Sequence, residues 1–140
     1  VVSGVVGEMG AAEPALVVKN GSGLFDANRA SARSLATLLR AAYRDPALGA
    51  DFVAQLAIGG VDGTLRARFR SWSGRRAIRA KTGTLEGVAA LSGYVLAPPG
   101  RSPVSFSILV NGIPGKVGEA RRGMDRVVDA IAAAIWDGAP

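Results

Sequence analysis

The sequence contains no cysteine and no histidine. Without cysteine there is no disulfide framework. Without histidine, every Ser-His-Asp and Cys-His mechanism is excluded and the commonest metal ligand is missing. No apolar run is long enough to span a membrane, and no stretch reads as a signal peptide. We therefore expect neither a metal site nor a cofactor.

Lysine is scarce, although the chain is basic. Three of the 17 basic residues are lysines, namely Lys19, Lys81 and Lys116, and the net charge is +6. This charge favours acidic partners without naming one. A length of 140 residues is enough for one domain with its own hydrophobic core, so we treat residues 1–140 as a single domain.

The first half of the chain is predicted to be mainly helical. Apolar residues at helical spacing predict a helix over 2–9, with Gly10 as its stop. Ser31 is a good N-cap for a second helix that ends near Tyr43, and Asp45-Pro46 starts a third that ends at Gly59-Gly60. The two remaining elements expected here are a short buried strand over 15–18 and a helical turn over 62–72.

The second half is predicted to form a sheet and a long helix. Apolar and alternating runs predict strands near 77–84, 88–97 and 103–111, and the Pro98-Pro99-Gly100 turn favours antiparallel pairing of the last two. A long apolar stripe predicts a helix from about Lys116 to Trp136 that packs on the sheet. The fold class expected is therefore α/β, an antiparallel sheet covered by helices.

The stretch Ala77–Leu85 carries the most chemistry, because it presents Lys81, Thr82, Gly83 and Thr84 in succession. On a strand, Lys81 and Gly83 point to one face, and Thr82 and Thr84 point to the other. A glycine inside a strand usually marks the close approach of a ligand or another backbone. A lysine and a threonine beside it make a small anion site. The alternative is an edge strand with a lysine facing water.

Six arginines cluster in residues 66–79, which lead into this strand. Phe69 and Trp72 lie among them, so a nucleic-acid surface with stacking groups is one interpretation. A solvated face that keeps a loop soluble is the interpretation that we favour, because no nucleic-acid-binding motif accompanies the cluster. We therefore expect no nucleic-acid partner. The arginines are Arg66, Arg68, Arg70, Arg75, Arg76 and Arg79.

Several motifs together resemble one protein family, the D-alanyl-D-alanine carboxypeptidase/endopeptidase family of low-molecular-mass, class C penicillin-binding proteins. The resemblance covers nearly the whole chain and implies the C-terminal part of a transpeptidase-like domain with a β-lactamase-like fold. The motifs are, in order, Asn20-Gly21-Ser22-Gly23-Leu24 with Asn28-Arg29, then Gly60-Val61-Asp62-Gly63-Thr64-Leu65, Ala80-Lys81-Thr82-Gly83-Thr84-Leu85, Gly87-Val88, and Leu91-Ser92-Gly93-Tyr94.

The chain departs from the family pattern in two ways. Asn20 stands where the family usually has Asp, and Phe25-Asp26 replaces Ser-Arg. The chain also contains neither Ser-x-x-Lys, which carries the nucleophile, nor Ser-x-Asn. Because both motifs lie upstream in the family, we expect the chain to need an upstream part of the same protein, or a second chain, and to be inactive alone.

The resemblance implies a role for each residue of the central motif. Lys81 would supply the field that holds the substrate carboxylate and assists proton movement, and Thr82 would hydrogen-bond that carboxylate. Gly83 would leave room for the substrate, and the Thr84 backbone N–H would form half of the oxyanion hole. The implied ligands are peptidoglycan stem peptides ending in D-Ala-D-Ala and β-lactams, and the implied location is periplasmic or extracytoplasmic.

Two other functions stay open from the sequence. One is a related serine β-lactamase or esterase of the same fold, and the other is a non-catalytic module that binds cell-wall peptide. Three further polar residues receive structural interpretations. Ser22 is expected to serve turn chemistry, Asp62 to be a cap or loop carboxylate, and Glu86 to face solvent.

Overall fold

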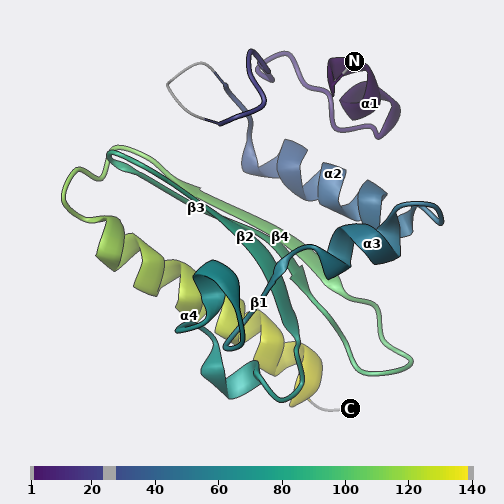
Figure 1. Ribbon diagram of the computed structural model, residues 1–140, viewed down its shortest axis with the longest axis vertical. Helices are drawn as coiled ribbons and strands as arrows, with labels where there is room; N and C mark the ends of the chain where they lie inside the picture. The colour runs from purple at the N-terminus through teal and green to yellow at the C-terminus, as the bar shows by residue number, and fades with distance from the viewer. Residues whose placement is uncertain (1, 24–27, 139–140) are drawn as a thin grey trace.

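The computed structural model of the protein describes residues 2–23 and 28–138. A four-stranded sheet lies between α4 on one face and α2 with α3 on the other (Figure 1). The elements in chain order are α1 (Val2–Glu8), α2 (Ala32–Arg44), α3 (Gly49–Ala54), β1 (Ala57–Ile58), the 3-10 turns η1 (Gly63–Leu65) and η2 (Arg70–Trp72), β2 (Ile78–Leu85), β3 (Val88–Val95), β4 (Val104–Val110) and α4 (Val117–Trp136).

The sheet has the order β1-β2-β3-β4, and every neighbouring pair is antiparallel. The predicted α/β class and the three long strands are confirmed. Glu86 and Gly87 form the turn between β2 and β3, and Gly87 has the positive φ of 66° that this turn requires. Gly93 is buried, and a Cβ there would lie 2.1 Å from Arg79 O, so only glycine lets the two strands approach this closely.

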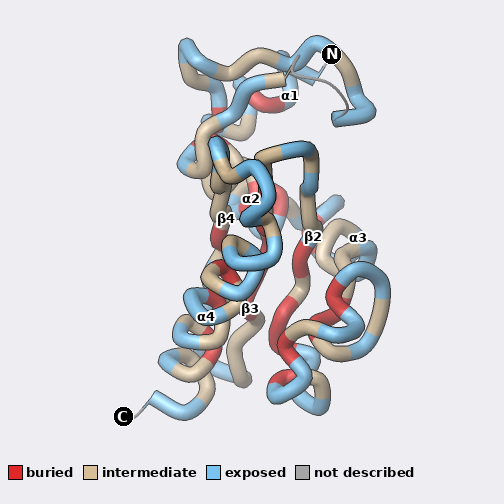
Figure 2. Tube along the Cα trace, turned by 90° about the vertical axis from the view of Figure 1, so that its left-hand side faces the viewer, coloured by how far each residue is buried: buried red, intermediate tan, exposed pale blue. Residues whose placement is uncertain are grey.

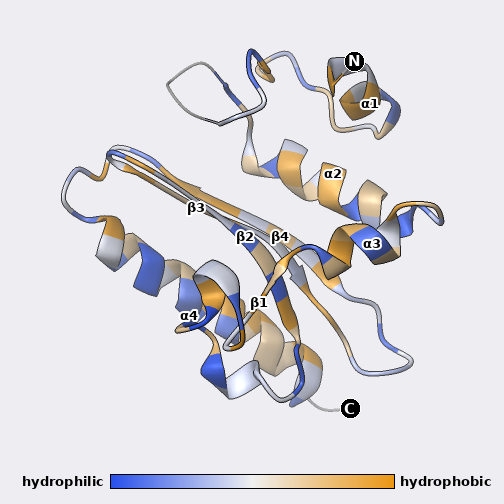
Figure 3. Cartoon of the chain, in the orientation of Figure 1, coloured by the Kyte–Doolittle hydropathy of each residue, from blue (hydrophilic) through white to orange (hydrophobic). Residues whose placement is uncertain are grey.

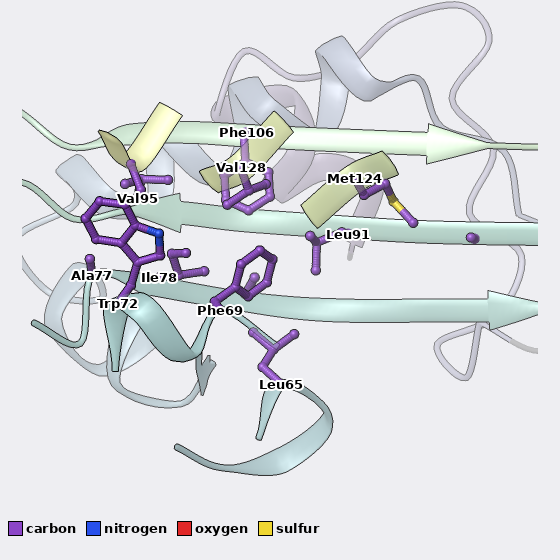
Figure 4. Close-up of a cluster of buried hydrophobic side chains, with 13 residues drawn as sticks. Leu65, Phe69, Trp72, Ala77, Ile78, Leu91, Val95, Phe106, Met124 and Val128 are labelled. Atoms are coloured by element: carbon purple, nitrogen blue, oxygen red, sulfur yellow. The ribbon is translucent and has the colours of Figure 1, made fainter. Parts of the chain in front are cut away.

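The face of the sheet toward α4 holds the main hydrophobic core (Figure 4). Side chains from β2, β3 and β4 alternate onto this face and meet the apolar stripe of α4, while η1, η2 and Phe69 close the core from the side. Burial of each large apolar side chain contributes roughly 1.5–3 kcal/mol. The larger members are Leu65, Phe69, Trp72, Ile78, Leu91, Val95, Phe106, Met124 and Val128.

The opposite face is anchored to α2 through Tyr94. Its hydroxyl donates to Leu39 O at 2.6 Å, and the rings of Tyr43 and Phe52 pack against it with centroids 5.5 and 6.5 Å away. Ser105 Oγ donates to Ala36 O, which ties β4 to the same helix. Figure 2 shows that buried segments follow the strands, while the outer faces of the helices are exposed.

The arginine-rich segment is held against α4 and is not simply a solvated face. Arg68 Nε donates to Asp125 Oδ1 at 3.0 Å, and the Trp72 indole N–H donates to Asp129 Oδ1 at 3.1 Å. Burial raises the pKa of Asp129, although the indole N–H opposes this shift. The expectation of a fully solvated cluster is therefore wrong for Arg68. Because Phe69 and Trp72 are buried, neither ring is placed to stack on a base.

Two predicted elements differ from the structure. Residues 15–18 form no strand, because among the described residues their only pairing is a single bridge between Val17 and Arg29, and Val18 is exposed. Asp45 caps the segment as expected, because its Oδ1 accepts from the N–H groups of Ala47 and Leu48, but residues 46–48 form a turn and the third helix begins at Gly49 and not at Pro46. It ends at Ala54, and the chain reaches Gly59-Gly60 through β1.

The first helix is confirmed, but most of its apolar face is uncovered. Val6 is buried, whereas the side chains of Val2 and Val5 are 56% and 44% exposed. Figure 3 shows α1 as an apolar helix that lies away from the sheet. Its link to the rest of the chain runs through Glu13, which accepts from Ser31 N–H at 3.0 Å, and through the hydrogen bond from Ser34 Oγ to Ala11 O.

Candidate active site

The Lys81–Thr84 motif lies on the half of β2 that β1 leaves uncovered. β1 pairs only with Arg79 and Ala80, and in the part of the chain that the structure describes no strand pairs with the outer side of β2 beyond them. The outer edge of β2 at Thr82 and Thr84 therefore presents backbone groups that do not pair with a neighbouring strand of the described residues. An edge of this kind accepts an extended peptide as an additional strand.

The register determines which backbone groups face outward. Gly59 N–H donates to Ile78 O at 2.9 Å, so the backbone groups of Ile78 point toward β1. Backbone groups of successive residues alternate between the two sides of a strand. Those of Thr82 and Thr84 consequently point to the open edge, and the Lys81 Nζ contact with Thr82 O at 2.7 Å agrees with this direction.

The side chains divide between the two faces of the sheet, as the strand alternation predicts. Lys81 and Gly83 pair with Ser92 and Ala90 on the α2 side. Thr82 pairs with Leu91 and Thr84 with Ala89, and both of these partners belong to the α4 core. The motif therefore offers a cation on one side of the open edge and two hydroxyls on the other.

A cleft of about 870 Å³ lies between the loop before α2 and the ends of β2, β3 and β4, and the residues of the open edge are part of its lining. Its walls come from the loop before α2, from the first turns of α2, and from the ends of β2, β3 and β4. A volume of this size accommodates a short peptide or a drug-sized molecule. The lining residues are Ser22, Gly23, Asn28, Arg29, Ala30, Leu35, Lys81, Thr82, Gly83, Thr84, Leu85, Val88, Ala90, Leu109 and Asn111.

Gly83 leaves the backbone at the floor of the cleft uncovered, because it has no side chain. A Cβ at this position would lie 3.2 Å from Ala90 Cβ, which is a tight contact. The small pair Gly83 and Ala90 thus leaves the backbone of β2 accessible from the α2 side. Close approach of a ligand at this glycine stays a prediction.

The loop before α2 is organised by two asparagines. Asn28 Oδ1 accepts from the N–H groups of Lys19 and Asn20, and its Nδ2 donates to Asn20 O at 3.0 Å. Asn20 Oδ1 accepts from Gly23 N–H and from Ser22 Oγ. An aspartate oxygen accepts the same bonds, so Asn20 preserves this turn, and the contact of Ser22 agrees with turn chemistry. The Phe25-Asp26 departure lies outside the described residues.

Two residues at the motif were missed in the sequence. Thr64, from η1, has its hydroxyl 3.0 Å from that of Thr82, and Arg121, from α4, donates to Thr84 Oγ1 at 2.8 Å. Thr64 stands in the Gly60–Leu65 motif but received no role there, and no local pattern singles out Arg121, because both contacts join residues far apart in sequence. The other two minor predictions are confirmed: Asp62 accepts from Ile58 N–H as a loop carboxylate, and Glu86 is exposed.

The donor set fits anion and peptide recognition. Residues 2–23 and 28–138 contain no group of three His, Cys, Asp or Glu side chains that is placed to hold a metal ion. No helix in the described ranges is long and apolar enough to cross a membrane. The groups available at the edge are one ammonium, hydroxyls and outward-facing backbone N–H groups, which together suit a substrate that carries a carboxylate and a developing oxyanion.

Comparisons with known proteins agree with this geometry. The model of the D-Ala-D-Ala carboxypeptidase 3 (S13) family matches residues 1–133. The chain is 40% identical over 105 residues to the D-alanyl-D-alanine carboxypeptidase of Actinomadura sp. (strain R39), covering 71% of this chain and 19% of that protein. It is 33% identical over 105 residues to the penicillin-sensitive carboxypeptidase A of Dictyostelium discoideum, covering 69% of this chain and 20% of that protein.

Solved structures show the same fold. Penicillin binding protein 4 from Haemophilus influenzae matches with a TM-score of 0.66 and 26% identity, covering 79% of this chain and 24% of that one. The same protein in complex with a β-lactam matches with a TM-score of 0.67 and 26% identity, covering 79% of this chain and 26% of that one. The chain thus spans about a fifth of the length of the curated relatives and about a quarter of these structures. With its family model matched from residue 1 to residue 133, the chain belongs to the D-Ala-D-Ala carboxypeptidase 3 (S13) family.

Proposed function

We propose that this chain is the C-terminal part of a serine D-Ala-D-Ala carboxypeptidase/endopeptidase and supplies its Lys-Thr-Gly strand. The observation that carries the proposal is the open edge of β2, where Lys81, Thr82 and Thr84 meet at a cleft. The named relatives are carboxypeptidases, and one structural neighbour binds a β-lactam. The substrates are peptidoglycan stem peptides ending in D-Ala-D-Ala, and the proposed location is periplasmic or extracytoplasmic.

The peptide lies against β2 as an added strand. The outward backbone groups of Thr82 and Thr84 hydrogen-bond it, and Gly83 allows it to approach the sheet. A β-lactam takes the same place, because its carboxylate and ring carbonyl mimic the two groups of the substrate. This binding fixes the scissile carbonyl next to Thr84.

Acyl transfer then proceeds in two steps. A serine outside this chain attacks the carbonyl carbon, and the Thr84 N–H and a second backbone N–H stabilise the oxyanion. The C–N bond breaks, the leaving D-Ala takes up a proton, and an ester to the serine remains. Water or an amine resolves this ester. Lys81, at the rim of the cleft, stabilises negative charge and assists the proton transfers.

Covalent labelling tests the proposal. The full-length protein that carries this chain is incubated with a fluorescent penicillin and separated on a denaturing gel, with the isolated 140-residue chain alongside. We expect labelling of the full-length protein and none of the isolated chain, because this sequence holds no Ser-x-x-Lys. If the full-length protein stays unlabelled but binds D-Ala-D-Ala peptides, the chain is part of a non-catalytic binding module instead.

A further inference from the structure

A second, smaller cavity lies at the other end of the sheet. It has a volume of about 160 Å³ and is formed between the last turns of α2, the end of β3 and the loop that leads into β4. Figure 1 places this loop at the end of the sheet opposite to the turn between β2 and β3, where the Lys81–Thr84 motif lies. The two cavities share no lining residue, so the smaller one is separate from the candidate active site.

The charge of this cavity comes from two arginines of α2. Arg40 and Arg44 are four residues apart on the helix, so they lie on the same face, and both line the cavity. Like charges at this spacing repel each other, and none of the lining residues is acidic. Within residues 2–23 and 28–138 neither arginine forms an ion pair or donates a hydrogen bond. The two cations therefore stand side by side, and no anionic group of the described protein relieves their repulsion.

The structural alternative is that these arginines serve the end of the helix. Arg44 lies in the last turn of α2, where a cation complements the helix dipole. A capping arginine also donates to the last carbonyl oxygens of a helix, as Arg101 does to Ile135 O at the end of α4. In the described part of the chain neither Arg40 nor Arg44 makes such a contact, and Arg40 lies a full turn before the end. The helix dipole therefore accounts for at most one of the two cations.

Hydroxyl groups complete the donor set of the cavity. Ser102 and Tyr43 line it and are exposed, and neither hydroxyl has a partner among the described residues. The hydroxyls of Tyr94 and Ser105, by contrast, donate to carbonyl oxygens of α2, so they hold the helix against the sheet and shape the wall. The planar guanidinium group matches the oxygens of phosphate, and hydroxyls donate to the same atoms.

The size of the cavity limits the ligand. A volume of about 160 Å³ corresponds to roughly five water molecules, which is enough for a phosphate group. It lies well below the volume that a drug-sized ligand occupies. A nucleotide or a peptide therefore cannot be enclosed here.

We propose that this cavity binds a phosphate dianion, as inorganic phosphate or as a terminal phosphomonoester. Arg40 and Arg44 donate to phosphate oxygens from one side, and Ser102 and Tyr43 donate from the rim. Two cations without an acidic neighbour match a doubly charged ligand better than a singly charged carboxylate. The bound phosphate links α2 to the loop before β4 and thereby stabilises the folded state. This site is independent of the function proposed above.

Isothermal titration calorimetry of the full-length protein tests the assignment. The titrants are inorganic phosphate, methyl phosphate and acetate, at constant ionic strength and at a mildly alkaline pH where both phosphates are dianions. The parent is compared with Arg40→Ala and Arg44→Ala. Arg33→Ala is the matched control, because Arg33 is exposed on the same helix, has the same charge and does not line the cavity.

We expect inorganic phosphate to bind the parent, and each of Arg40→Ala and Arg44→Ala to weaken this binding about tenfold, since a charge-assisted contact is lost. Arg33→Ala should bind phosphate like the parent, and acetate should bind the parent about tenfold more weakly than phosphate. Failure of the parent to bind either phosphate would overturn the proposal. So would parental affinity in both cavity variants, an equal loss in Arg33→Ala, or equal binding of acetate.

Methyl phosphate distinguishes the two sources of the phosphate group. Ser102 is exposed at the rim, so a phosphomonoester can leave its substituent in solvent. Similar affinities for methyl phosphate and inorganic phosphate would assign the cavity to phosphomonoesters, whereas binding of inorganic phosphate alone would assign it to the free ion.

Thermal unfolding provides a second readout that a change of surface charge alone does not move. Phosphate should raise the Tm of the parent and of Arg33→Ala more than that of Arg40→Ala or Arg44→Ala. Circular dichroism confirms that each variant is folded, which the exposure of both arginines leads us to expect. A parent that binds phosphate but is not labelled by penicillin would defeat the proposed function and leave this site intact, so the two failures are distinguishable.

Discussion

Arg68 and Asp125 join the loop before β2 to α4 across 57 positions of sequence. Arg68 Nε donates to Oδ1 at 3.0 Å and to Oδ2 at 3.2 Å, and Nη2 also donates to Oδ1. The two side chains are 14% and 25% exposed. Paired groups this well shielded from water are weakened little by solvent and salt, so the pair fixes the segment that carries Phe69 and Trp72 into the core.

We predict that Asp125→Ala lowers the free energy of unfolding by roughly 1–3 kcal/mol, because it leaves a half-buried guanidinium without its acceptor. Thermal unfolding of the single and double variants with Arg68→Ala measures the coupling. The exposed pair Arg75–Asp137, 46% and 56% exposed, is the matched control and should contribute about 0–1 kcal/mol. Equal coupling energies for the two pairs would contradict the argument from burial.

Tyr94 is expected to make the free energy of unfolding depend on pH in the alkaline range. Burial, and secondarily the nearby Tyr43, raise the pKa of Tyr94 from 10.0 to about 12. Because the folded state favours the protonated phenol, the stabilisation is complete below pH 10 and is lost as the pH rises toward about 12.

We predict that Tyr94→Phe costs roughly 0.5–1.5 kcal/mol at neutral pH, since the hydrogen bond from its hydroxyl to Leu39 O is lost. Its unfolding free energy should depend less on pH between 10 and 12 than that of the parent. Urea unfolding across this range measures both effects. Identical pH curves for Tyr94→Phe and the parent would show that the phenol ionises freely in the fold.

The arginine-rich segment is expected to bind nucleic acid weakly. Phe69 and Trp72 are buried, and Arg68 is paired, so only phosphate contacts from the remaining arginines contribute. Such contacts weaken steeply with salt. Fluorescence anisotropy with single- and double-stranded DNA should show binding that disappears at moderate salt, and sequence-selective binding at physiological salt would show that the cluster reads nucleic acid.

The sheet and α4 were predictable because their signals are local. Residues of β4 alternate between the core and the opposite face of the sheet, and the apolar stripe of α4 continues along the whole helix. Burial of one face is therefore enough to determine the secondary structure of each element. β1 has only two residues and exists because Arg79 and Ala80 pair with it. The strand expected over 15–18 fails for the converse reason, since its apolar residues find a single bridging partner and no sheet to join.

The sequence predicts the site residues that lie on β2, but not the residues that contact them from other elements. Lys81, Thr82, Gly83 and Thr84 stand together in the sequence, and the family resemblance gave them roles. Thr64 and Arg121 reach the motif from η1 and α4, and their contacts depend on how those elements pack on the sheet. An exposed arginine on a helix has no pattern that distinguishes it from a solvating one, so only the structure brings it to Thr84.

Substitutions in the motif test the proposed roles in the full-length protein. Lys81→Ala removes the cation that faces the substrate carboxylate and the developing oxyanion, and it should slow acylation by penicillin roughly 10²–10³-fold, the usual cost of one preorganised electrostatic group. Lys81→Arg should restore the acylation rate only in part, because the planar guanidinium does not replace a compact ammonium in a tight site.

Thr82→Val should slow acylation less than Lys81→Ala, since it removes one hydrogen bond to a charged group, worth about 1.5–3 kcal/mol. Thr84→Ala should have a milder effect still, because alanine keeps the backbone N–H that is the proposed contribution of this residue. Stopped-flow acylation rates, with circular dichroism as a check on folding, measure each effect. A folded Lys81→Ala protein that acylates at the parental rate would mean that the strand is only structural.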